Sequence, residues 1–304
     1  MRPYAFLLAV HLVLGATATH AAIPATERSV LLDLYTSTNG TNWTNKTGWN
    51  GASGTECNWF GITCDSSGTS VRQILLGSNN LTGTLPASLN FLTSLQGVYL
   101  SGNHLTGSIP SLAGLSHLAN LVLSDNQLTG SIPSLAGLSS LSSLTVRGNQ
   151  LTGFIPSLTG LSQLVTLDAY DNQLTGPIPS LTALSNLTHL VVARNQLTGS
   201  IPTLTGLSHL NVLSVSDNQL TGSIPSLAGL SNLDNLDVSN NRLTGSIPQL
   251  TGLRLSYLRA SNNQLTGSIP LLPSPSLFLL DASNNQLTGS IPSLAGLSNV
   301  MYFI

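Results

Sequence analysis

An asparagine that recurs every 22 to 24 residues is the feature that most constrains what this 304-residue chain can fold into. The first interval between successive asparagines is 24 residues, the next six are 23 and the last two are 22. Self-similarity at such a period predicts a solenoid, in which each repeat forms one coil and buries its apolar side against its neighbours. The recurring asparagines are Asn79, Asn103, Asn126, Asn149, Asn172, Asn195, Asn218, Asn241, Asn263 and Asn285.

The residues before each asparagine predict a short strand. In the frame Leu118-x-x-Leu121-x-Leu123-x-x-Asn126, the last two leucines alternate with outward residues, which is the period of a strand. Coils stacked on one another then form a parallel sheet with strands about 4.8 Å apart. The asparagine amide both donates and accepts hydrogen bonds, so it can satisfy backbone groups of its own and the adjoining coil. The sequence therefore predicts a buried asparagine ladder.

The residues after the asparagine reverse the chain. Leu128-Thr129-Gly130-x-Ile132-Pro133 combines a glycine, which allows backbone angles closed to other residues, with a proline, which ends strand pairing. This frame resembles the leucine-rich repeat of the plant type, whose hallmark is Leu-Thr-Gly-x-Ile-Pro. The resemblance covers residue 71 to the end of the chain. It implies an α/β-type solenoid, a superhelix with a parallel sheet on the concave face and short irregular or 3-10 segments on the convex face.

The first seventy residues predict a secretion signal and a cap. Residues 1–21 combine a basic start, a short apolar run and a small-residue cleavage pattern, as in a secretory signal peptide, and the run is too short to span a membrane comfortably. Val30, Leu31 and Leu34 lie at helical spacing after Thr26. Cys57 and Cys64 predict a local disulfide, because a metal site would need two further ligands that the sequence does not supply.

The segment around these cysteines also resembles a known cap. Cys57-x-Trp59-x-Gly61-Ile62-x-Cys64 is similar to the N-terminal cap of the same repeat family. We therefore expect a signal peptide over residues 1–21, an N-terminal cap over 22–70 and about ten repeats over 71–304, with no evident C-terminal cap. Sequons begin at Asn39, Asn42, Asn45, Asn80 and Asn186, and they would carry glycans only in a source that glycosylates secreted proteins.

Composition and motifs exclude several functions. Charged residues make up only 7% of the chain, so no basic stripe is present for nucleic-acid binding. A hydrophobic content of 41% excludes intrinsic disorder. The sequence holds neither a G-x-G-x-x-G nor a G-x-S-x-G motif, and its histidines are scattered. We therefore expect no catalysis, no cofactor and no metal site. Outside the signal segment, no stretch is a candidate membrane span.

The placement of charge indicates a recognition face. Every aspartate after residue 95 falls between the leucines of the strand frame and the ladder asparagine, which we assign to the concave sheet, and Arg147, Arg194 and Arg259 share that face. Three consecutive coils can bring their variable residues into one candidate ligand-binding patch. Its members are Arg147, Asp168, Tyr170, Asp171, His189 and Arg194. An aspartate just before the asparagine, as at Asp125, Asp171 and Asp217, can instead simply hold a turn.

These observations favour a secreted, non-catalytic protein that binds a protein, peptide or cell-wall glycan on the concave face, and they leave its oligomeric state open. The resemblance points to receptor ectodomains and polygalacturonase inhibitors, so one alternative is the ectodomain fragment of a longer receptor. A second alternative is an ice-binding protein, because threonines form one column at the coil rise. They are Thr82, Thr106, Thr129, Thr152, Thr175, Thr198, Thr221, Thr244, Thr266 and Thr288. The same column also belongs to the repeat frame whatever the ligand is.

Overall fold

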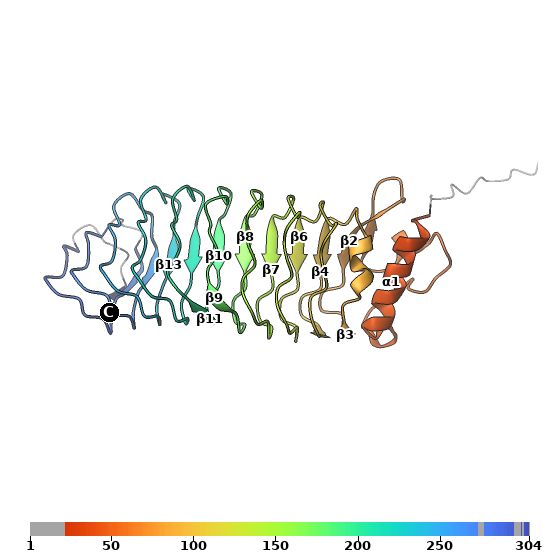
Figure 1. Ribbon diagram of the computed structural model, residues 1–304, viewed down its shortest axis with the longest axis horizontal. Coiled ribbons are helices and arrows are strands. Elements are labelled where there is room, and N and C mark those ends of the chain that lie inside the picture. The colour runs from red at the N-terminus through yellow and green to blue at the C-terminus, as the bar shows by residue number, and fades with distance from the viewer. Residues whose placement is uncertain (1–21, 273–276, 295–298, 300, 304) are drawn as a thin grey trace, which may run out of the picture.

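The protein forms an elongated solenoid whose coils stack along one axis (Figure 1). The computed structural model describes residues 22–272, 277–294, 299 and 301–303, so the signal peptide predicted for residues 1–21 lies outside the described residues. One twelve-stranded sheet runs along the stack, and every neighbouring pair in it is parallel except the first. In sheet order its strands are β1 (Ile62–Cys64), β2 (Val71–Leu75), β4 (Gly97–Tyr99), β6 (Asn120–Val122), β7 (Ser143–Thr145), β8 (Thr166–Asp168), β10 (His189–Val191), β12 (Val212–Ser214), β13 (Asn235–Asp237), β14 (Tyr257–Arg259), β15 (Leu279–Asp281) and β16 (Tyr302–Phe303).

The core is a stack of aliphatic rungs. From β6 to β15 the central residue of each strand is a leucine in register with the next, as Leu144, Leu167 and Leu190 show, and these three side chains are fully buried. Burying one such side chain contributes roughly 1.5–3 kcal/mol. The residues on either side of each leucine point to the opposite face and remain partly exposed. The parallel sheet and the superhelix are therefore as the sequence predicts.

The recurring asparagines form a continuous ladder inside the solenoid. Asn149 is typical: its Nδ2 donates to the carbonyl oxygens of Val146 at 3.0 Å and Leu123 at 3.1 Å, and its Oδ1 accepts from the Leu128 backbone N–H at 3.0 Å. Each asparagine thus joins its own turn to the preceding coil. The residues from Asn79 to Asn172 in this ladder are buried, and those from Asn195 onward are partly buried.

A second backbone ladder runs along another face. The short strands β3 (Thr82–Thr84), β5 (His104–Thr106), β9 (Thr175–Pro177) and β11 (Gln196–Thr198) lie in the Leu-Thr-Gly frame and pair in parallel, β3 with β5 and β9 with β11. Isolated bridges continue the row between them, as between Ser131 and Thr152. We call the outward side of this row the hydroxyl face, because threonine and serine side chains cover it.

The N-terminal cap closes the first coil. It contains helix α1 (Ala25–Ser37) and the 3-10 turns η1 (Gly40–Asn42) and η2 (Glu56–Asn58), and Cys57 and Cys64 form the predicted disulfide. Val30, Leu31 and Leu34 of α1 are buried, as their spacing predicts. The helix is tied to the sheet because the Val71 backbone N–H donates to the Glu27 carboxylate at 2.7 Å. The other 3-10 turn, η3 (Ala87–Phe91), packs against α1.

Inside the cap, a charged pair lies against one ring of an aromatic cluster. Arg28 forms a salt bridge with Glu56, whose side chain is 1% exposed, and its guanidinium lies 5.3 Å from the centre of the Trp59 ring. Trp59 packs on Trp49, which packs on Trp43. No helix among the described residues has the length and apolar character of a membrane span.

Candidate binding surface

The middle of the concave face brings five of the six predicted site residues close together, four of them through the strand register and Arg194 through its contact with Tyr170. Register places Asp168 of β8 between Thr145 of β7 and Val191 of β10, and it places His189 beside Thr166 in the neighbouring row. Arg147 follows β7 and Tyr170 follows β8. Short strands on consecutive coils therefore hold these side chains on one surface, about one strand spacing apart.

Asp168 is the electrostatic centre of this patch. Its carboxylate is half-buried and accepts a hydrogen bond from the Tyr170 backbone N–H at 3.1 Å. Burial raises the pKa of Asp168 above its ordinary value, and the nearby Asp125 acts in the same direction. The hydrogen bond from the Tyr170 backbone N–H, and then Arg147 and His189, partly oppose the shift. Burial makes this carboxylate harder to ionise. Groups whose pKa is shifted in this way cluster at functional sites.

Arg194 is a cation without a carboxylate partner. Its guanidinium lies 5.5 Å from the centre of the Tyr170 ring, a cation–π contact, and no carboxylate of the described chain lies within salt-bridge distance of it. Arg147 differs, because its Nε lies 4.0 Å from the Asp125 carboxylate. Both members of that pair are more than half exposed, so the pair contributes at most about 1 kcal/mol.

The prediction that every aspartate lies on the concave sheet is wrong for several of them. Asp125, Asp171 and Asp217, like Arg194, follow the strands and have left-handed backbone with φ between 52° and 55°. The chain must turn there to bring the next residue, the ladder asparagine, inward, and aspartate tolerates this conformation. Asp234 lies before β13, where its carboxylate accepts a hydrogen bond from Ser256. Asp171 therefore belongs to a turn at the edge of the patch.

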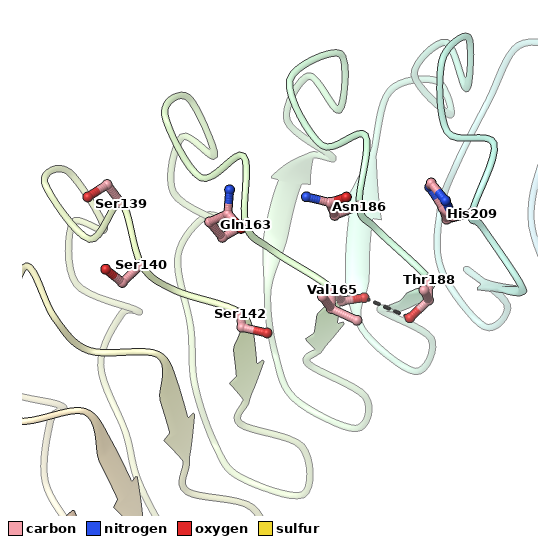
Figure 2. Close-up of a pocket in the computed structure, with 8 residues that line it drawn as sticks. All are labelled: Ser139, Ser140, Ser142, Gln163, Val165, Asn186, Thr188 and His209. Atoms are coloured by element: carbon pink, nitrogen blue, oxygen red, sulfur yellow. Dashed lines mark hydrogen bonds between the residues drawn. The ribbon is translucent and has the colours of Figure 1, made fainter. Parts of the chain in front are cut away.

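A groove crosses the opposite edge of the sheet, where the strands begin. Its volume is about 650 Å³, and Figure 2 shows mostly polar side chains from consecutive coils lining it. Thr188 donates to the Val165 carbonyl oxygen at 3.1 Å, and Nδ1 of His209 lies 3.0 Å from the Ser185 carbonyl oxygen. The groove is lined by Ser139, Ser140, Ser142, Gln163, Val165, Asn186, Thr188 and His209. No acidic or basic side chain other than a histidine lines it, so it lacks the electrostatic character of the Asp168 patch.

Sequence reasoning missed an aromatic cluster further along the same concave face. The ring centres of Tyr257 and Phe278 lie 5.7 Å apart, and those of Phe278 and Tyr302 lie 5.8 Å apart. The three rings come from successive coils, next to or within β14, β15 and β16. Their positions in successive repeats are the signal that could have found them. Within the described part of the chain, no three His, Cys, Asp or Glu side chains group as metal ligands would.

Comparisons with known proteins agree with this architecture. Residues 24–65 match the leucine rich repeat N-terminal domain, and the leucine rich repeat itself matches residues 94–115, 117–138, 209–230, 232–252 and 276–297. A receptor protein kinase, WSS1 of Oryza sativa subsp. japonica, is 36% identical over 108 residues, which are 35% of this chain and 11% of the kinase.

Solved structures of two kinds resemble the chain. A plant peptide hormone receptor, RGFR1 in complex with RGF2, is 37% identical with a TM-score of 0.70, and the match covers 77% of this chain but 39% of the receptor chain. A plant ice-binding protein is 27% identical with a TM-score of 0.72, and the match covers 90% of both chains. The matches therefore span well under half of the WSS1 kinase and of the RGFR1 receptor chain. It is a leucine-rich repeat protein with an N-terminal cap of the plant type.

Proposed function

We propose that this protein is a non-catalytic recognition protein that acts outside the cell and binds an extended basic peptide, or a basic segment of a partner protein, on its concave face. The observation that carries the proposal is the half-buried Asp168, whose pKa is raised by burial on a surface otherwise open to a ligand. A lysine or arginine of the ligand next to this carboxylate would offset the cost of its burial.

The charge of the whole face supports a basic ligand. The strands from β6 to β16 hold three aspartates, Asp168, Asp237 and Asp281, and one arginine, Arg259, a net charge of −2 with histidine neutral. Such a face attracts cationic partners and steers their approach. The receptor RGFR1 was solved with the peptide RGF2, which supports a peptide as the class of ligand for this fold. Because the chain spans 39% of that receptor, the choice of ligand rests on this chain's own charges.

Asp168→Asn is expected to weaken the binding of a basic peptide about tenfold, which is the loss of one partly desolvated charge contact. Suitable probes are lysine-containing peptides selected on the purified protein from a phage-displayed random library, with affinities measured by calorimetry. Because burial raises the pKa of Asp168, wild-type binding should weaken on acidification at a higher pH than an ordinary aspartate, with a pKa of about 3.9, would give.

The same substitution should not lower the stability of the folded protein, although it weakens binding. A raised pKa means that the folded state favours the protonated carboxyl, so wild-type stability falls as pH rises through the pKa of folded Asp168. Asp168→Asn should therefore melt no lower than wild type at pH 7, and the difference should disappear near pH 3. Asp217→Asn, which alters an exposed turn, serves as the control. Selected peptides with no excess of lysine or arginine would contradict the proposal.

A second candidate function is ice binding on the hydroxyl face. In β11 the side chains of Gln196 and Thr198 point to solvent while Leu197 is buried, and Ser200 continues the exposed row. The exposed threonine and serine columns continue coil by coil to Thr288 and Ser290. In the preceding coils the serine column is interrupted by Phe154 and Pro177. A regular array of hydroxyl groups at the strand spacing can order water. The structural match with the plant ice-binding protein covers 90% of each chain.

Thr221→Lys combined with Thr244→Lys is expected to abolish any inhibition of ice recrystallisation, because two long charged side chains would break the repeating surface. The backbone N–H groups of both threonines would keep their bonds to the preceding coil at 2.7 Å, so the fold should persist. Ice growth is measured in a splat assay. Asp168→Asn is the control and should leave ice growth unchanged. Wild-type protein without effect on ice growth would dismiss this candidate and leave the concave-face proposal standing.

A further inference from the structure

We propose that Tyr257, Phe278 and Tyr302, the aromatic cluster, form a second anchoring subsite for the same peptide, which takes a large aromatic side chain. This inference rests on the proposed function and extends it, because it assigns the ligand two contact points and the distance between them. Aromatic rings that remain accessible on a binding face are the residues that most often dominate binding energy.

The geometry of the cluster suits a ring from a ligand. Tyr257 and Phe278 are tilted by 59° and Phe278 and Tyr302 by 67°, so the cluster presents both ring faces and ring edges. Tyr302 is 49% exposed, whereas Tyr257 and Phe278 are partly buried and give the cluster a fixed base. An added aromatic ring can therefore pack edge-to-face without displacing a side chain from the core.

The cluster lies on the same surface as the Asp168 patch. Register along the sheet runs from His189 through Val212 and Asn235 to Tyr257, and then to Leu279 and Tyr302. The intervening strands β12 and β13 present Val212, Ser214, Asn235 and Asp237 on this face, none of them longer than an aspartate or an asparagine. A peptide backbone can therefore lie close to the sheet between the two contact points.

Charge next to the cluster has the same sign as the Asp168 carboxylate. Arg259 lies 5.1 Å from the centre of the Tyr257 ring and is in register with Asp237 on one side and Asp281 on the other. Two carboxylates thus flank one cation, which leaves a local charge of −1. A basic residue beside the aromatic anchor of the ligand is favoured here for the same reason as at Asp168.

The spacing fixes the length of the ligand segment. Four strand steps separate β8 from β14, which is about 19 Å at 4.8 Å per step. An extended chain rises about 3.3 Å per residue, so about six residues bridge the two contact points. A ligand in which a lysine and a tryptophan are separated by about five residues should therefore engage both.

The test uses fluorescein-labelled peptides that carry two lysines, a glycine–serine spacer of one, five or eleven residues, and a tryptophan. Fluorescence anisotropy with the full chain should show tightest binding for the five-residue spacer, about tenfold tighter than the same peptide with Trp→Ser. Tyr257→Ser and Tyr302→Ser should each remove most of that gain and leave the tryptophan-free peptide unaffected. Phe154→Ser, which removes an aromatic ring that is 65% exposed on the hydroxyl face, should change neither affinity.

A photo-crosslinking experiment on the wild-type protein avoids variants that misfold. Benzoylphenylalanine in place of the tryptophan should label the coils from residue 257 to 303 and spare the coil of β4. Equal affinities across the three spacers, or labelling spread over all coils, would overturn the subsite. If the lysine contribution still depends on Asp168 while the tryptophan adds nothing, only the subsite fails. If no peptide binds the wild-type protein at all, the proposed function fails with it.

Discussion

Replacing Asn149 with alanine is expected to lower the free energy of unfolding by about 3 kcal/mol, the cost of leaving buried polar groups without partners. The Leu128 backbone N–H donates to Asn149 Oδ1 at 3.0 Å and would be left unsatisfied inside the solenoid. The carbonyl oxygens of Val146 and Arg147 would lose the amide that bridges them. Urea unfolding followed by circular dichroism measures the change.

The neighbouring Gln150 provides the control, because its side chain is exposed and Gln150→Ala should change stability by less than about 0.5 kcal/mol. Since each coil contacts mainly its neighbours, a weakened rung in the middle of the stack should also separate the transition into two steps. A single cooperative transition with an unchanged midpoint would show that the ladder contributes little to stability.

Arg28→Ala is expected to cost about 4 kcal/mol, because it leaves a buried carboxylate without its cation. Glu56 is 1% exposed, and after the substitution the one donor left to it among the described residues would be the Gly54 backbone N–H, at 2.9 Å. Arg28 also donates to the Gly51 carbonyl oxygen at 2.8 Å and lies over Trp59, so the cap would lose packing as well as charge. Differential scanning calorimetry and tryptophan fluorescence report on the cap directly, because Trp43, Trp49 and Trp59 all lie there.

Two variants separate charge from packing in that result. Arg147→Ala removes an arginine from an exposed pair and should cost less than about 1 kcal/mol. Adding Glu56→Gln to Arg28→Ala should recover a substantial part of the loss, because an amide is far less costly to bury than an unpaired carboxylate. A double variant no more stable than Arg28→Ala would assign the whole effect to lost packing.

The repeat made most of the fold predictable from sequence. Leucine alternation and the 23-residue period are local signals, and they specify the strands, their stacking and the inward asparagines. The turn before each asparagine was harder to predict. If the strand pattern is continued past the end of the strand, Asp125 and Asp171 are wrongly assigned to the sheet. The strands end after three residues, and a left-handed residue then redirects the chain.

At the candidate site, the sequence could not show contacts that depend on how neighbouring coils align. Asp168 and His189 are outward residues of adjacent strands, two positions apart in register, so the sequence could place them on one face. Phe278 was missed because it lies just outside the alternating positions, and its contacts with Tyr257 and Tyr302 depend on how neighbouring coils align. The Arg28–Glu56 pair follows no periodicity, so only the folded cap reveals it.

Because every coil rises by the same distance, the number of repeats sets the distance between the two contact groups. Removing or duplicating one repeat between β10 and β14 would leave each contact group intact and shorten or lengthen the distance between them by about 4.8 Å. Gain or loss of whole repeats would therefore change the length of ligand that fits. Point substitutions within a coil would change only the side chains that contact the ligand. Length discrimination and chemical discrimination would then evolve as separate traits.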